Sequence, residues 1–144
     1  MTYILAIETS CDDTAVSILK DDKTILTNIV SSQIKHHSKF GGVVPELASR
    51  LHAEKINSII DLALQEASIS LQDLTSIAVT IGPGLEGSLL VGISVAKTLA
   101  LSLSIPLIPV NHIKGHIFAH LANHSEQYPF MALIVSGGHT QLVH

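Results

Sequence analysis

Short apolar runs and longer stretches of mixed polarity alternate along the chain. The short runs are rich in Ile, Val and Leu and are bounded by turn residues, which predicts β-strands. These strands are expected over residues 3–8, 14–19, 24–32, 76–81, 107–110, 130–135 and 140–143. A polar loop is expected over 36–42, where two glycines precede the next element.

Apolar residues three and four positions apart predict helices in the longer stretches. The first helix covers residues 45–67, where Pro45 is favoured in the first turn. The second covers 87–104 and is expected to be buried against a sheet. The third is expected over 112 to about 123, with Asn111 as its cap.

The order of these elements indicates an α/β fold. Residues 4–11 and 132–139 resemble each other, because both are apolar strands that run into a tight turn of small residues. Two facing hairpins of this kind describe the actin-like ATPase fold, in which a nucleotide lies between two lobes. We therefore expect one lobe over 1–110, the truncated start of a second lobe over 111–144, and a longer parent protein.

The most apolar run, residues 89–110, is long enough to cross a membrane. It contains Gly92, Lys97, several serines and two prolines, which favours a helix against a sheet followed by a short strand. The N-terminus has no basic region, so no secretory signal is expected and the cytoplasm is the predicted compartment.

Composition narrows the class of protein further. Hydrophobic residues make up 47% and charged residues 14% of the chain, which excludes a disordered protein, a charged coiled coil and a polybasic nucleic-acid tail. Cys11 is the only cysteine, so an intramolecular disulfide is excluded. Nine histidines outnumber the eight Lys and Arg residues, which suggests metal, substrate or pH chemistry.

A glycine-rich segment over 82–87 has the spacing G-x-G-x-x-G between a predicted strand and helix, as in dinucleotide-binding folds. Such folds also need an acidic residue about twenty positions later, and no Asp or Glu lies between Glu86 and Glu126. Pro83 also removes one N–H that would serve a phosphate. A structural turn that lets the loop approach a ligand or partner is favoured, and a role near phosphate or RNA stays open.

The polar turn over 8–14 carries small hydroxyl residues and carboxylates. Hydroxyl and N–H groups in a tight turn can hold phosphate, and a carboxylate can hold Mg²⁺ or act as a base. An ordinary acidic turn is the alternative. The similar turn over 136–139 favours the functional interpretation.

His112 and His116 lie four residues apart, so both imidazoles face one side of a helix and can reach one metal ion. A polar helix face is the alternative. The absence of a Glu between them leaves a thermolysin-like protease without its base. Each further step of four residues overshoots a helical turn by ~40°, so His120 and His124 rotate away from such an ion. Four other histidines are expected to be solvated or in linkers: His36, His37, His52 and His144.

Five segments together carry a resemblance to a known family. They are IETSCDDT over 7–14, GGVVPELASR over 41–50, GPGL over 82–85, the H-x-x-x-H of 112–116 and VSGGHT over 135–140. With these segments the chain resembles the tRNA threonylcarbamoyladenosine transferases (TsaD-like), once described as O-sialoglycoprotein endopeptidases. The resemblance runs along the whole chain and covers roughly the first two fifths of a typical member.

The resemblance implies the actin-like ATPase fold (ASKHA, RNase H-like) and a group transfer. The threonylcarbamoyl group of threonylcarbamoyl-AMP would go to the N6 amine of the adenosine beside the anticodon. By the resemblance, His112 and His116 are ligands of an iron or zinc ion whose third protein ligand is an Asp beyond His144. Asp12 matches an acid important for activity, as a base or an orienting group. The nucleotide of the donor, an adenylate or Mg-ATP type ligand, would lie at Ile134, Val135, Ser136, Gly137, Gly138 and His139.

The implied partners are tRNA, an inactive paralogue and a small ATPase of the same bacterial pathway, and no membrane. A small-molecule kinase and a non-catalytic scaffold of the same fold are the rival functions. No covalent intermediate is required, so Cys11 is expected to be a small turn residue. The segment 41–50 has no role that its spacing reveals. By itself the chain is expected to bind metal weakly, to catalyse nothing, and to self-associate through uncovered apolar surface.

Overall fold

One five-stranded mixed sheet forms the centre of the computed structural model, which describes residues 1–21, 24–121, 129–135 and 140–143. The strand order is β3 (Thr24–Ser32), β2 (Asp13–Lys20), β1 (Tyr3–Glu8), β4 (Ser76–Gly82) and β5 (Leu107–Asn111). β1, β2 and β3 are antiparallel neighbours, whereas β4 pairs in parallel with β1 and β5 with β4. The predicted α/β fold and its antiparallel opening are confirmed.

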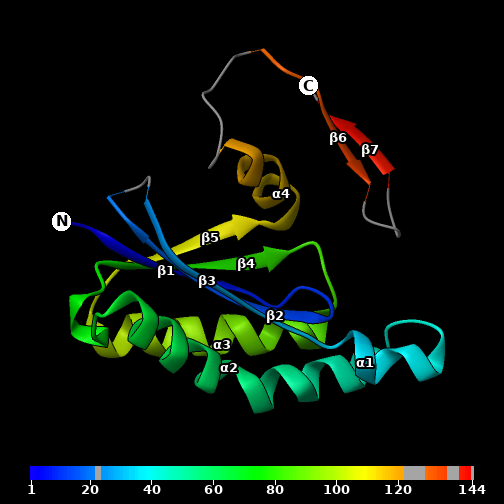
Figure 1. Cartoon of the computed structure of the whole chain (residues 1–144), viewed down its shortest axis with the longest axis horizontal. Coiled ribbons are helices and arrows are strands. Elements are labelled where there is room, and N and C mark those ends of the chain that lie inside the picture. The colour runs from blue at the N-terminus through cyan, green and yellow to red at the C-terminus, as the bar shows by residue number, and fades with distance from the viewer. Residues whose placement is uncertain (22–23, 122–128, 136–139, 144) are drawn as a thin grey trace.

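Two long helices, α2 (Pro45–Ala67) and α3 (Glu86–Leu103), lie side by side against one face of this sheet (Figure 1). Short helical turns α1 (Ile34–His37), η1 (Ser38–Phe40) and η2 (Leu71–Asp73) connect the larger elements. α4 (His112–Leu121) follows β5, and β6 (Ala132–Val135) pairs with β7 (Thr140–Val143) in a separate two-stranded sheet.

The two faces of the sheet differ because successive side chains of a strand point to opposite sides. Large apolar residues face α2 and α3 and form the core with them, among them Leu5, Ile7, Val16, Ile77 and Val79. The other face carries small residues from the same strands, and together with α4 it encloses a cavity of about 330 Å³. The small side chains leave room for a ligand on the α4 side.

The expected polar loop over 36–42 is wrong for its first part, because α1 and η1 form short helical turns there. The Gln33 carbonyl accepts hydrogen bonds from the N–H groups of His36 (2.8 Å) and His37 (3.2 Å), and the His37 side chain is buried. The buried His37 side chain and the hydrogen bonds to the Gln33 carbonyl therefore stabilise helical turns in a segment of polar sequence.

α3 packs against the sheet as expected, with one face buried and the other exposed. Ala96 and Ala100 pack in the core, whereas Leu90 is 63% exposed and Leu101 is 82% exposed. α3 is also the one helix among the described residues that is long and apolar enough to cross a membrane. Its packing against the sheet explains the same composition.

Other helix and strand limits agree with the sequence analysis. α2, β1, β3 and β7 have the predicted bounds, and the remaining strands and helices differ by one or two residues at their ends. Asn111 caps α4 as expected, because its Oδ1 accepts from the N–H groups of Ile113 (3.0 Å) and Lys114 (3.2 Å). The division into lobes at residue 110 stays a prediction.

Candidate functional site

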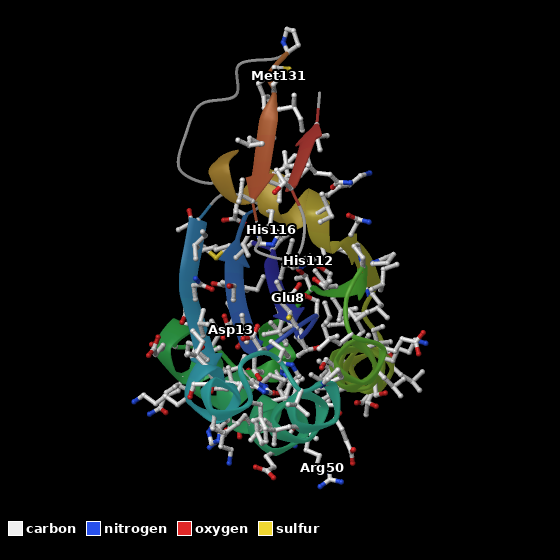
Figure 2. All side chains as sticks on the ribbon, turned by 90° about the vertical axis from the view of Figure 1, so that its right-hand side faces the viewer. Glu8, Asp13, Arg50, His112, His116 and Met131 are labelled. Atoms are coloured by element: carbon white, nitrogen blue, oxygen red, sulfur yellow. The ribbon has the colours of Figure 1, made fainter. Side chains whose placement is uncertain are left out.

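The carboxyl ends of the parallel strands β1, β4 and β5 meet at one edge of the sheet, where α/β proteins commonly bind ligands. Glu8 is the last residue of β1, and His112 is the first residue of α4, directly after β5. Figure 2 places the Glu8, His112 and His116 side chains together at this edge. The three residues line the cavity between the sheet and α4.

The two imidazoles converge on one point. The Nε2 atoms of His112 and His116 are 3.1 Å apart, and the rings lie edge to face at 80°. With metal–nitrogen bonds of about 2.0–2.1 Å, two nitrogens on one ion are separated by about 2.9–3.4 Å for octahedral to tetrahedral angles. The pair therefore fits two positions around one ion. No group of three His, Cys, Asp or Glu suited to a metal occurs in the part of the chain that the structure describes.

Glu8 and Ser10 hold the His112 ring from the other side. Nδ1 of His112 lies 3.1 Å from the Ser10 hydroxyl and 3.4 Å from Oε2 of Glu8. A carboxylate only accepts hydrogen bonds, so Nδ1 carries the proton and the Nε2 lone pair is free. Histidines that bind metals usually donate their other ring N–H to a carboxylate, a backbone carbonyl or water, and Glu8 fits this role.

Glu8 was not singled out as a partner of His112 from the sequence. The available signal was an acidic residue at the end of an apolar strand, on the same face as Ala6. Burial raises the pKa of Glu8, but hydrogen bonds with Ser10 and Thr80 and the nearby His112 outweigh it, so the pKa lies below its ordinary value. Glu8 is therefore a carboxylate at neutral pH and can hold the His112 N–H.

The glycine-rich loop over 82–87 lies close to residues 9–12 of the same chain, which connect β1 to β2 and form the β1–β2 turn. A Cβ on Gly84 would lie 2.6 Å from the Ser10 carbonyl oxygen, and the Leu85 N–H donates to that oxygen at 2.8 Å. The loop is therefore a structural turn that contacts its own chain, and its approach to a ligand or partner stays a prediction. Gly84 is required because no side chain fits between the loop and the turn.

Asp12 and Cys11 lie in the same β1–β2 turn. The Asp12 carbonyl accepts from the Gln33 N–H at 3.0 Å, while the catalytic role of the carboxylate stays a prediction. Cys11 reaches the surface, but burial of its thiol, together with the neighbouring Asp12, raises the pKa to about 11. The thiol is protonated at neutral pH, which agrees with a turn residue rather than a nucleophile.

Two histidines expected to be solvated are buried, which corrects that prediction. His37 is 3% exposed and His52 is fully buried. Both nitrogens of each ring have a polar partner, so each ring compensates for the loss of water. His36 is exposed as predicted, whereas His144 lies outside the described residues.

The remaining predicted residues are only partly described. His120 belongs to α4, and His124 lies outside the described residues. Of the predicted donor site, Ile134 is buried and Val135 is exposed in β6, and 136–139 lie outside the described residues. Their contact with a nucleotide stays a prediction.

Solved structures share this fold. YeaZ from Pseudomonas aeruginosa superposes with a TM-score of 0.63 at 20% identity, covering 100% of this chain and 65% of that chain. T. thermophilus RuvC, solved in complex with a Holliday junction substrate, gives a TM-score of 0.51 at 11% identity, covering 85% and 71%. The fold is therefore the predicted actin-like, RNase H-like fold.

Sequence relatives are much closer. Proteins from Streptococcus equi subsp. equi and Streptococcus pneumoniae, both named tRNA N6-adenosine threonylcarbamoyltransferase, are 56% identical over 142 residues. The match covers 99% of this chain and 42% of each relative. The family model described as "TsaD: tRNA N6-adenosine threonylcarbamoyltransferase" matches residues 24–144. The chain belongs to the TsaD family of tRNA N6-adenosine threonylcarbamoyltransferases.

Proposed function

We propose that the protein to which this chain belongs transfers a threonylcarbamoyl group from threonylcarbamoyl-AMP to a tRNA. The acceptor is the N6 amine of the adenosine beside the anticodon in tRNAs that read codons beginning with A. The observation that carries this proposal is the 56% identity, over 99% of the chain, with relatives named for this transfer. Because the chain spans 42% of those relatives, the activity is proposed for the full-length parent.

The paired imidazoles support a metal centre at His112 and His116. Their Nε2 atoms are 3.1 Å apart, and Glu8 fixes the tautomer that leaves the His112 Nε2 free. Nitrogen donors of this kind suit iron, our first candidate, and also zinc. A bound divalent ion would act as a Lewis acid that polarises an oxygen of the donor. The third protein ligand is expected outside this chain.

The cavity beside the pair supports a small ligand at this edge of the sheet. It measures about 330 Å³ and is lined by Glu8, Thr80 and both histidines, besides small residues of the strands and α4. Asp12, in the adjacent turn, would orient the acceptor amine or take its proton. The donor's adenylate would contact Ile134, Val135 and the turn that follows them.

The transfer requires partners beyond this chain. We place the protein in the cytoplasm with tRNA, an inactive paralogue and a small ATPase, since the donor and acceptor are a soluble adenylate and a large RNA. By itself the chain supplies two metal ligands and one side of the nucleotide site. It is therefore expected to bind metal weakly and to show no turnover.

The test uses the full-length parent with the donor adenylate, the pathway proteins and unmodified tRNA. Mass spectrometry of tRNA nucleosides should detect threonylcarbamoyladenosine with the wild type. His112→Ala and His116→Ala should abolish it, whereas His36→Ala, an exposed histidine of α1, should leave it unchanged.

Absence of the modified nucleoside, with partners of proven activity, would overturn the proposal. ATP consumption stimulated by a sugar or an acid without tRNA would instead favour a small-molecule kinase. Binding of the pathway partners without any turnover would favour a scaffold.

A further inference from the structure

Three successive carbonyl groups of the β1–β2 turn are held by three different parts of the chain. The Ser10 carbonyl accepts from the Leu85 N–H (2.8 Å), and the Asp12 carbonyl accepts from the Gln33 N–H (3.0 Å). The Cys11 carbonyl between them lies 3.0 Å from Nε2 of His52. His52 is the only side chain among these three donors, so its bond is the one that a substitution can remove.

The direction of these carbonyls determines what the turn offers to a ligand. In a planar trans peptide the C=O and the following N–H point in opposite directions. Because the carbonyls of Ser10, Cys11 and Asp12 point toward their donors, the N–H groups that follow them point away. The bonds that hold these carbonyls therefore also fix the directions of the N–H groups of Cys11, Asp12 and Asp13.

His52 holds both sides of the turn. A carbonyl only accepts, so Nε2 carries the proton toward Cys11, and Nδ1 accepts from the Thr14 hydroxyl at 2.7 Å. His52 is fully buried on α2, and Thr14 is 1% exposed on β2. The ring therefore ties the residue before Asp12 to the strand after it.

The segment 41–50 places this histidine. Its residue Val44 donates to Nδ1 of His37 at 3.3 Å, and Nε2 of His37 lies 3.0 Å from Oε1 of Gln33. Nε2 of Gln33 in turn donates to the Ala48 carbonyl at 3.3 Å. Gln33, whose N–H donates to the Asp12 carbonyl, is thus held against the start of α2. Arg50 lies on the outer side of α2, away from Glu8, and pairs with Glu46 (Figure 2).

We propose that His52 is a positioning residue for the transfer, which acts by fixing the β1–β2 turn and with it Asp12. This inference rests on the proposed function and assigns a role to the helix that begins in segment 41–50. His52 touches neither substrate nor metal in this role. Its loss changes the orientation of the turn rather than the ligands of the ion.

The two amide variants of His52 separate its two bonds. His52→Gln reaches the Cys11 carbonyl, whereas His52→Asn keeps a partner for Thr14 and loses Cys11. In the full-length parent, His52→Asn should lower kcat about 10–100-fold and leave the KM for tRNA within about twofold, because misplacement of a reacting group costs rate. His52→Gln should restore most of the rate. His36→Asn, the same change at an exposed site, should behave as wild type.

A second measurement needs no activity. Cys11 lies in the β1–β2 turn, so its alkylation rate in the full-length parent, followed on its own peptide by mass spectrometry, reports the turn directly. His52→Asn should raise that rate several-fold over His36→Asn, and His52→Gln should raise it less. Thr14→Val replaces the hydroxyl that bonds Nδ1 by a methyl group and so removes the other bond of the ring. If His52→Asn does not fold, a raised alkylation rate in Thr14→Val tests the same tie from the β2 side.

Equal kcat and equal Cys11 alkylation in folded His52→Asn and His36→Asn would overturn the positioning role. A parent that makes no threonylcarbamoyladenosine would overturn the proposed function instead, and the alkylation rates would still decide whether His52 holds the turn. A fall in melting temperature alone, with unchanged kcat and alkylation, would assign His52 to stability and also contradict the proposal.

Discussion

At the scale of single residues, one carboxylate decides which nitrogen of His112 is available. Glu8 accepts a hydrogen bond from Nδ1–H, Ser10 adds a second contact, and the Nε2 lone pair faces Nε2 of His116. Either ring nitrogen of a neutral histidine can carry the proton, and the hydrogen bond made by one nitrogen decides which of them is left to bind a metal. The selection explains why an acidic residue ends an otherwise apolar strand.

Glu8→Gln tests this selection through metal affinity. The glutamine amide has the same shape but donates as well as accepts, so it no longer enforces the Nδ1–H tautomer. We expect the metal affinity of the full-length parent to fall about 10–100-fold, measured by competition with a chelator. Glu46→Gln, an exposed residue paired with Arg50, is the matched control. Equal affinities of the two variants would contradict the role of Glu8.

The lowered pKa of Glu8 also predicts a pH dependence of stability. A group with a depressed pKa in the folded state stabilises the protein above its ordinary pKa, and this stabilisation is lost as the pH falls through the folded value. For Glu8 the loss should begin below its ordinary value of 4.5. Urea unfolding across this range should show a steeper loss for wild type than for Glu8→Gln. Parallel curves would indicate that Glu8 has no favourable partners in the fold.

At the scale of elements, the close contact of α3 with the end of β1 positions the β1–β2 turn. The Thr9 hydroxyl donates to the Ser88 carbonyl at 2.8 Å, and a Cβ on Gly92 would lie 2.4 Å from that hydroxyl oxygen. Since Thr9 is buried and hydrogen bonded, it has little freedom to move. The approach of the helix therefore depends on a glycine at position 92.

Gly92→Ala should therefore destabilise the chain by about 1–3 kcal/mol through overpacking. Gly115→Ala in α4 is the matched control, because nothing lies within 4 Å of its added Cβ. That change should stabilise the chain by up to about 1 kcal/mol through helix propensity. Denaturant unfolding measures both, and destabilisation of equal size in the two variants would contradict the close contact of α3 with Thr9.

At the scale of the whole molecule, the helices cover one side of the sheet and leave apolar surface outside. Leu90 and Leu101 lie eleven residues apart on α3, which brings them to one face of that helix, and both are exposed. Lys97 lies between them and is also exposed. The outer face of α3 thus carries two exposed leucines among Ser94, Lys97 and Thr98. Exposed leucines without a partner favour contact with another protein surface.

Self-association of the isolated chain is the corresponding prediction. Sedimentation velocity should show concentration-dependent association that is weakened in the double variant Leu90→Glu, Leu101→Glu. Gln72→Glu, a change at an exposed residue of η2, adds negative charge elsewhere and should not alter it. If the chain remains monomeric at high concentration, or if both variants behave alike, α3 is not the associating surface.

Local patterns in the amino-acid sequence predict the elements and identify the family. The spacing of apolar residues predicts β1, β3 and α2. Residues four positions apart lie on the same face of a helix, so the sequence also predicts that His112 and His116 are neighbours. The motifs of the first and last hairpins and of segment 41–50 led to the family that the relatives then showed.

The partners of those residues follow from the packing of distant elements and not from any local pattern. Glu8 meets His112 across 104 positions of sequence, and His52 meets Cys11 across 41. The sequence predicts His37 and His52 to be solvated, whereas both are buried. Burial depends on which elements pack together. A local pattern contains no information on such distant neighbours, and the order of the strands and the placement of α2 supply it.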